Sequence, residues 1–180
     1  DIGGVLCGRG VINSLELDSL TIAGDAGKRM LAWGKAEGKA TAAEIDLIRL
    51  TQVKLDVKPE VKPFSATLAF AKDGKFRQAQ LAGEGKWNAT IRPKGADYEV
   101  DFSARNWQLP LGAPIPVSDV RAKGVLNLDG LTVSEFEADA MEGKVNGTLQ
   151  VGFGPVVKVA SDLSIARVKA DLLMPSFTKD

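Results

Sequence analysis

Hydrophobic and polar side chains alternate along most of the chain, so that every second residue is apolar. Because successive side chains of a β-strand point to opposite faces, this period of two predicts strands that are apolar on one side only. The clearest runs, given by their apolar positions, are Phe64/Ala66/Leu68/Phe70, Trp87/Ala89/Ile91, Tyr98/Val100/Phe102/Ala104, Ala122/Gly124/Leu126/Leu128, Phe136/Ala138/Ala140, Val145/Gly147/Leu149/Val151/Phe153 and Val157/Val159/Ser161/Leu163/Ile165. The pattern therefore predicts a mainly β fold.

Turn signals containing glycine separate several of these runs. Asp73-Gly74 and Asp129-Gly130 each follow an alternating run and are typical of β-hairpins. Pro93-Lys94-Gly95 lies between two alternating runs and predicts that they pair. By contrast, the segment 105–118 contains three prolines, which cannot donate hydrogen bonds to a sheet, so we expect a long surface connection there.

The first fifty residues are less regular. A strand through Leu15 and Leu17 changes phase near Asp18-Ser19, and only a bulge there would keep the later apolar residues on the same side. Further along, the segment 41–50 opens with a capping box, Thr41 with Glu44, and continues with apolar residues at helical spacing. This segment is the one short helix that we predict.

Strands that are apolar on one side must bury that side, and one short helix cannot cover them all. The architecture expected is therefore a curved antiparallel sheet or two packed sheets, an open trough or a sandwich, with one short helix. A chain of 180 residues, 44% of them hydrophobic, is the size of one domain, so we expect a single β-rich domain over 1–180. The opening Asp1-Ile2-Gly3-Gly4 resembles the interior of a protein, and we interpret the chain as a fragment of a longer one.

Composition argues against several classes of function. The 23 basic and 23 acidic residues are interleaved, which argues against nucleic-acid binding. Histidine is absent, so the usual general base and the commonest zinc ligand are missing. The single cysteine, Cys7, lies in an apolar run and is predicted to be a buried thiol. We therefore expect no metal, no cofactor and no enzymatic activity.

Two rows of acidic residues are the remaining candidates for chemistry. Alternate residues of a strand project together, so each row could bind calcium or supply the acid/base pair of a carboxylate-based glycosidase, a class that can act without histidine. Each row also backs onto an apolar row, which favours the solvated face of a one-sided sheet. We take the solvated face as the main interpretation and the glycosidase as a lesser alternative. The rows are Asp97/Glu99/Asp101 and Glu135/Glu137/Asp139.

The C-terminal third combines alternating strands with spaced glycines, in the runs 122–126, 141–149 and 163–165, followed by 172–173 and preceded by 107–112. In this arrangement the chain resembles the AsmA-like family, in outline over residues 40–177. The resemblance implies a bacterial envelope protein with a β-rich body in the periplasm. It also implies a tether to the inner membrane through a segment that this chain does not contain.

The AsmA-like family is associated with outer-membrane assembly, and its longer relatives with carrying phospholipid along a β-lined groove. Our leading hypothesis is a non-enzymatic periplasmic domain that shelters or passes the acyl chains of phospholipid or another lipid, with envelope proteins as further partners. The alternative is a structural or protein-interaction β module of an envelope or secretion assembly. The residues predicted to line a lipid path are Phe64, Leu68, Phe70, Trp87, Ile91, Tyr98, Val100, Phe102, Leu149 and Val151.

Overall fold

The computed structural model describes residues 10–23, 43–56, 61–84, 86–108, 116–140, 142–153 and 158–167. Within these segments all regular structure is β-strand and no helix occurs, so the mainly β prediction is confirmed. The strands are β1 (Gly10–Ile12), β2 (Leu15–Asp18), β3 (Thr21–Ala23), β4 (Ala43–Ile45), β5 (Leu47–Asp56), β6 (Phe64–Phe70), β7 (Phe76–Gly83), β8 (Trp87–Lys94), β9 (Asp97–Gln108), β10 (Pro116–Leu126), β11 (Gly130–Ala140), β12 (Gly143–Gly152) and β13 (Lys158–Ala166).

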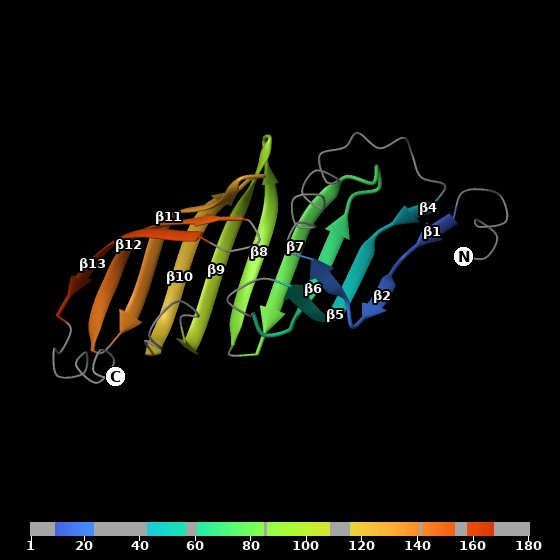
Figure 1. The fold of residues 1–180 in the computed structure, drawn as a ribbon. Helices are drawn as coiled ribbons and strands as arrows, with labels where there is room; N and C mark the ends of the chain where they lie inside the picture. The colour runs from blue at the N-terminus through green and yellow to red at the C-terminus, as the bar shows by residue number, and fades with distance from the viewer. Residues whose placement is uncertain are drawn as a thin grey trace.

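The strands form one large open sheet (Figure 1). Its order is β13-β12-β11-β10-β9-β8-β7-β6-β5-β2, with β3 paired to β5 beside that row and β1 paired to β4 in a separate short ladder. From β5 to β13 each strand pairs antiparallel with the next one in the chain. Of the two architectures expected, the single sheet is confirmed for the described residues, and the pair of packed sheets is wrong.

The N-terminal edge of the sheet is parallel, unlike the rest. β1 pairs with β4, and both β2 and β3 pair with β5, all in one constant register. Residues 10, 15 and 21 pair with residues 43, 48 and 54, in each case 33 positions later in the chain. Ser19 and Gln52 lie opposite each other in this register, and both adopt positive φ, 58° and 52°. Because the register is unchanged on both sides of this pair, neither strand contains an extra residue, and the bulge expected near Asp18-Ser19 is wrong. The two left-handed residues bend both strands together instead, and Leu20 and Ile22 pack against the same cluster as Leu50.

The helix predicted over 41–50 is wrong in its described part. Residues 43–45 form β4 and residues 47–50 begin β5, while Thr41 lies outside the described residues. In β5 the apolar Ile48 and Leu50 alternate with Arg49 and Thr51, and this strand pairs with β6 on one side and β2 on the other. Pairing on both sides outweighs a local capping signal, because a short helix gains little stability without tertiary packing.

The predicted hairpin turns are confirmed. Gly74 has φ of 77°, and the backbone N–H of Lys75 donates to a carboxylate oxygen of Asp73 at 3.1 Å. The Asn127 side-chain oxygen accepts from the backbone N–H groups of Asp129 and Gly130 at 2.9 and 3.1 Å, which closes the β10–β11 turn. The β8–β9 hairpin turns directly after Lys94, at Gly95, whose φ is 63°.

The proline-rich connection is shorter than predicted. β9 continues to Gln108 and β10 already begins at Pro116, so only residues 109–115, which lie outside the described residues, separate the two strands. A proline is tolerated as the first residue of a strand, where its missing N–H removes no interior hydrogen bond. The prediction of a connection over 105–118 is therefore wrong at both of its ends.

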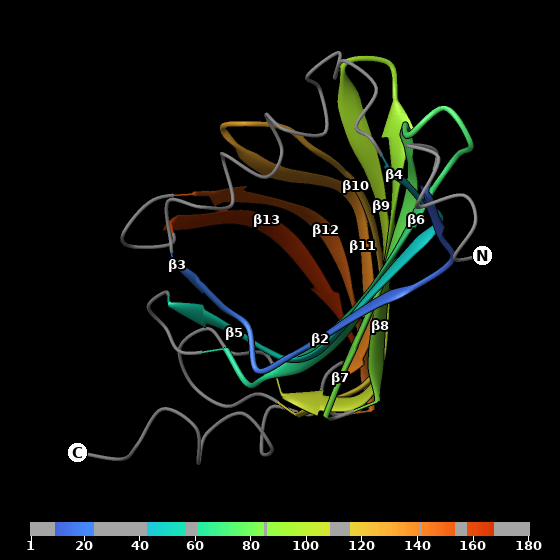
Figure 2. The same ribbon diagram turned by 90° about the vertical axis from the view of Figure 1, so that its right-hand side faces the viewer.

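The long strands bend around one side of the sheet, as the view along the row of strands shows (Figure 2). Four ladders contain register shifts, namely β5–β6, β6–β7, β10–β11 and β11–β12. Asn106 adds a left-handed residue within β9, with φ of 49°. An extra residue in one strand of a pair bends that strand and increases its twist, which accounts for the bend.

Candidate functional site

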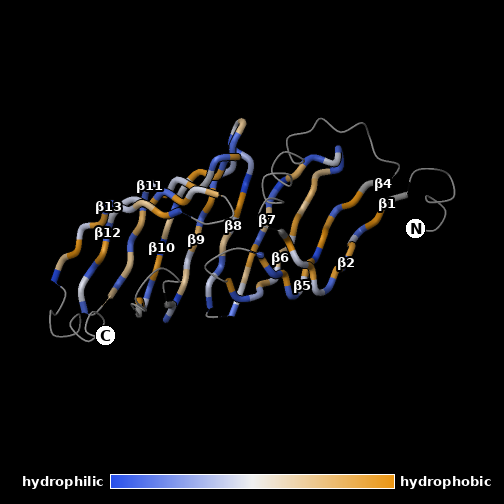
Figure 3. The backbone as a smooth tube through the Cα atoms, in the orientation of Figure 1, coloured by the Kyte–Doolittle hydropathy of each residue, from blue (hydrophilic) through white to orange (hydrophobic). Residues whose placement is uncertain are grey.

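One face of the sheet is apolar from edge to edge, and we call it the apolar face. Residues paired across antiparallel strands share a face, so the register identifies its members. One row of register partners, which we call a rank, crosses the sheet from strand to strand. It consists of Ile48, Leu68, Ala79, Ile91, Val100, Gly124, Val133 and Leu149. The hydropathy colouring shows the same alternation along the strands (Figure 3). The rank extends the pattern over eight strands, from β5 to β12.

All ten residues predicted to line a lipid path lie on this apolar face. Phe64 and Trp87 both pair with Gly83, and Trp87 also pairs with Ala104. Phe102 pairs in register with Ala122. Tyr98 pairs with Leu126, Leu126 with Leu131, and Leu131 with Val151, so these residues lie on the same face. Phe70 pairs in register with Phe76, and the Phe76 ring lies 5.8 Å from the ring of Tyr98, so Phe70 lies on the apolar face as well. The alternation thus brings together residues from four strands, β6, β8, β9 and β12, and their role toward lipid stays a prediction.

Aromatic rings gather in two groups on the apolar face. Phe76 contacts Phe70 and Tyr98 edge to face near one end of their strands, with centroids 6.1 and 5.8 Å apart. Toward the other end, a chain of rings joins Phe64 to Trp87, Phe102 and Trp107 at 5.9, 6.0 and 5.2 Å. Between the groups lies a band of aliphatic side chains, namely Ala66, Leu68, Ala79, Leu81, Ala89, Ile91 and Val100.

Trp87 lies over Gly83, and this position depends on the glycine. A Cβ at residue 83 would collide with the indole ring of Trp87, including its Nε1 and Cε2 atoms. The ring packs against both hydrophobic clusters of the sheet, one centred on β10–β11 around Val120 and the other on β5–β6 around Val53. Among the described residues Trp87 is the side chain that contacts both clusters.

The apolar face contains fully buried, half-buried and exposed side chains, and the most exposed of them lie at the edges of the sheet. Val53 and Val120 are only 1% exposed, and no polar or charged residue is buried in the described part of the chain. Burial raises the pKa of the Tyr98 hydroxyl above its usual value. At the edges, Leu17 of β2 is 42% exposed and Ile165 of β13 is 59% exposed. Within the described segments, no helix and no second sheet covers this face.

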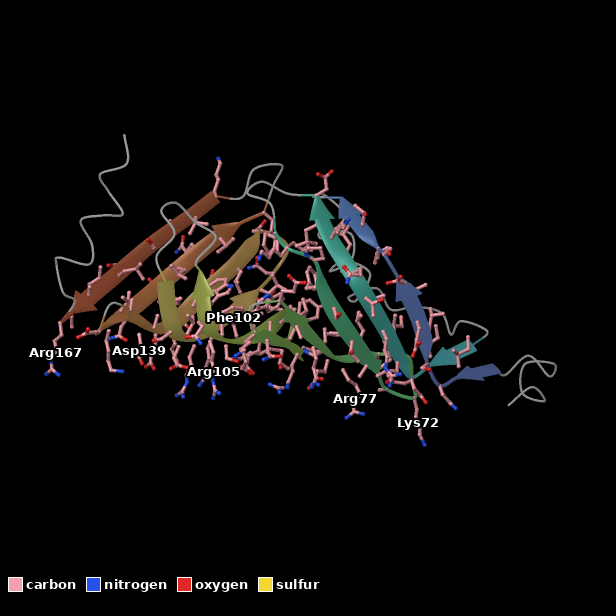
Figure 4. The ribbon with its side chains drawn as sticks, turned by 90° about the horizontal axis from the view of Figure 1, so that it is seen from below. Lys72, Arg77, Phe102, Arg105, Asp139 and Arg167 are labelled. Carbon is pink, nitrogen blue, oxygen red and sulfur yellow. The ribbon has the colours of Figure 1, made fainter. Side chains whose placement is uncertain are left out.

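The opposite face is polar and carries cross-strand ion pairs. Lys94 binds Glu99 at 2.9 Å, Arg92 binds Asp101 at 3.0 Å, and Lys144 binds Asp139 at 2.9 Å. The hydrogen bond from Lys94 lowers the pKa of Glu99, and the hydrogen bond to Asp139 raises the pKa of Lys144. Figure 4 shows Arg77, Arg105 and Asp139 projecting on the side of the sheet opposite to Phe102.

The two acidic rows lie on this polar face, which bears on the glycosidase alternative. Lys123 of β10 pairs in register with Asp101 of β9 and Glu135 of β11, and its Nζ lies 3.7 Å from Glu135. The acids are therefore neighbours along one surface with a base between them. A glycosidase needs two carboxyl groups that flank the substrate, whereas these acids lie side by side on one surface together with lysine and arginine side chains.

A hollow of about 750 Å³ also lies on the polar face, between β9 and β12. Its charged lining residues include partners that already bind each other, since Arg105 contacts Asp119 at 3.8 Å and Lys144 contacts Asp139. Both signs of charge are present and the side chains are exposed, so the hollow presents no preference for an anion or a cation. We therefore place the candidate site on the apolar face.

Metal binding has no candidate among the described residues, where no three acidic or cysteine side chains are grouped suitably. We expect a chelator such as EDTA to leave the thermal midpoint of the protein unchanged within a degree, because the acids on the polar face pair with lysine and arginine. Differential scanning fluorimetry with and without chelator checks this. A drop of several degrees would mean that one of the acidic rows holds calcium.

Several members of the apolar face escaped the sequence prediction. β7 was not predicted as a strand, although its Gln78-Ala79-Gln80-Leu81 alternates with period two. Ile48 and Leu50 of β5 lie in the segment 41–50 that the sequence predicts as a helix. Trp107 is half-buried against Phe102, whereas Cys7 and Trp33 lie outside the described residues.

Comparisons of this chain with protein-family models, with curated proteins and with solved structures found no match. In the described part of the chain there is no helix that could span a membrane. The AsmA-like resemblance therefore rests on the sequence pattern alone.

Proposed function

We propose that the apolar face is an open trough that shelters or passes the acyl chains of phospholipid or another lipid, without making or breaking bonds. The observation that carries this proposal is an apolar surface that continues over the whole sheet and that no described element covers. A soluble protein rarely leaves such a surface facing water unless it binds something there.

The dimensions of the sheet suit a long, thin ligand. Nine strands from β5 to β13 give eight spacings of about 4.8 Å, or roughly 38 Å across the strands. An acyl chain spans about half of a hydrocarbon core that is roughly 30 Å thick, hence about 15 Å. One chain would therefore cross three to four strands, which leaves length for a second chain or for movement along the trough.

The composition of the floor also favours a chain-like ligand. Ala66, Ala79 and Ala89 alternate with Leu68, Leu81 and Ile91 in the band between the two aromatic groups. Phe64 and Phe70 stand six positions apart on β6, about 20 Å at 3.4 Å per residue. Small side chains leave room above the sheet, while the rings on either side can contact an acyl chain along its length.

The energetics suit transfer as well as storage. Each CH₂ removed from water contributes about 0.8 kcal/mol, so a chain of roughly sixteen carbons gains about 13 kcal/mol over free solution. Measured against a bilayer, which is also apolar, the gain nearly vanishes. A protein with such a trough can therefore take lipid from one membrane and release it to another.

We also propose that the chain is a periplasmic part of an AsmA-like envelope protein that acts in outer-membrane assembly. Supporting this, the glycine-spaced run 141–149 that carries the resemblance includes most of β12, where Gly143 and Gly147 pair with Ala140 and Phe136. Fractionation of the source cells would test it: we expect the protein with the inner membrane and exposed to the periplasm. A cytoplasmic location would refute this part.

Two measurements test lipid binding directly. Protein purified from bacterial membranes should carry lipid in native mass spectrometry, and delipidated protein should bind a fluorescent fatty acid at micromolar concentration. Both follow from the burial of acyl chains on the apolar face. If neither measurement detects lipid, the carrier function is wrong, and the structural or protein-interaction module takes its place. The exposed edge strand β13 is the observation that favours that second candidate.

A further inference from the structure

The two edges of the sheet differ in how well they are protected from pairing with another strand. The N-terminal edge is divided into pieces of three, four and three residues, interrupted at Ser19 by a left-handed residue. At the other edge, β13 is nine residues long, exposed throughout, free of proline and paired with β12 without a register shift. A long regular edge strand is a template for a further strand, whereas short, broken edges resist pairing.

β13 also carries two charges on the polar face that have no ion-pair partner among the described residues. Lys158 and Asp162 are four positions apart, so they point to the same side of the strand. They pair in register with Gly152 and Thr148, neither of which is charged. Elsewhere on the polar face, neighbouring strands satisfy many of their charges through ion pairs such as Arg92–Asp101 and Lys144–Asp139.

A second copy of the chain would satisfy both charges at once. In an antiparallel pair of two identical strands, one residue faces its own counterpart and the others face each other symmetrically. Centring the pair on Ala160 places Lys158 opposite Asp162 of the second copy, and Asp162 opposite Lys158 of the second copy. Centring it on Asp162 would overlap more residues, but it would place two carboxylates directly opposite each other, which is destabilising.

We propose that two copies of this protein associate edge to edge through β13, antiparallel and centred on Ala160. The two-fold axis is then perpendicular to the sheet, so the apolar faces of both copies lie on the same side. On that side Val159 neighbours Ser161 of the second copy, and the apolar face runs from one subunit into the other. This inference goes beyond the proposed function and does not depend on what the apolar face binds.

Disulfide trapping tests the register. In a Cys7→Ser background, Ala160→Cys should give a disulfide-linked dimer on mild oxidation, because directly opposed residues have Cα atoms about 4.5–5.5 Å apart, within disulfide range. Ser164→Cys, on the same face of the same strand, is the matched control. In the proposed register its two copies are eight residues apart along the strands, about 27 Å, and should not cross-link.

Charge reversal tests the interaction itself. By sedimentation velocity of delipidated protein, Lys158→Asp or Asp162→Lys should each weaken the dimer about tenfold, because each creates two like-charge pairs. The double variant Lys158→Asp/Asp162→Lys exchanges the charges and should restore association. The proposal is overturned if the unaltered protein stays monomeric at high concentration, if the double variant does not recover, or if Ser164→Cys cross-links as readily as Ala160→Cys. Since the protein is delipidated, these outcomes are separate from those of the lipid test.

Discussion

Replacing Trp87 with alanine should lower the free energy of unfolding by about 3 kcal/mol, the low end of the range for large aromatic side chains because this ring is half-buried. Trp87 packs against both hydrophobic clusters and lies between Phe64 and Phe102 in the chain of rings. A single-layer sheet has few contacts between distant strands, so a side chain that joins its two clusters couples its two halves. Urea unfolding followed by circular dichroism measures the change.

Trp107→Ala is the matched control for this variant. Trp107 is also a half-buried tryptophan on the apolar face, but of the two clusters of described residues it packs against the one around Val120 alone. We expect it to cost at least 1 kcal/mol less than Trp87→Ala and to leave unfolding a single transition, whereas Trp87→Ala should broaden it. Gly83→Ala, which displaces the Trp87 ring without removing it, should change stability in the same direction. Equal losses for the two tryptophans would show that Trp87 does not couple the clusters.

The apolar face was predictable because it depends on one simple rule. Side chains alternate across a strand, and consecutive strands joined by tight hairpins keep their apolar residues on the same side. The turns at Asp73-Gly74 and Asp129-Gly130 are short enough to carry the alternation from one strand into the next. Ten residues chosen from their alternation alone therefore lie on one surface.

The edge of the sheet was not predictable, because its pairing is not local. β2 and β3 pair with β5 through residues 33 positions away. Parallel strands are joined by long connections and not by tight turns, so no turn sequence indicates which strand is the partner. The same pairing explains the wrong helix, since 47–50 has apolar residues that satisfy either period in so short a segment. The number of sheets was open for a related reason: alternation shows that a face is apolar, but not what covers it.

Introducing aspartate at Leu68 or Leu149 should abolish lipid binding if the apolar face is the binding surface. The two residues lie in the same rank of the face, on β6 and β12, with Ile91 and Val100 between them. Both are half-buried, so a carboxylate there faces the space where an acyl chain would lie. Placing that charge against hydrocarbon costs several kcal/mol, and 4 kcal/mol already corresponds to roughly a thousandfold loss of affinity.

Thr67→Asp and Gln150→Asp are the matched controls, because each places the same charge one position away, on the opposite face of the same strand. They should bind the fluorescent fatty acid as the unaltered protein does, and all four variants should keep a strand-dominated circular dichroism spectrum. The position of the charge, rather than its presence, then decides binding. If Leu68→Asp and Leu149→Asp remain folded and still bind lipid with unchanged affinity, the lipid lies elsewhere on the protein and the apolar face is not its site.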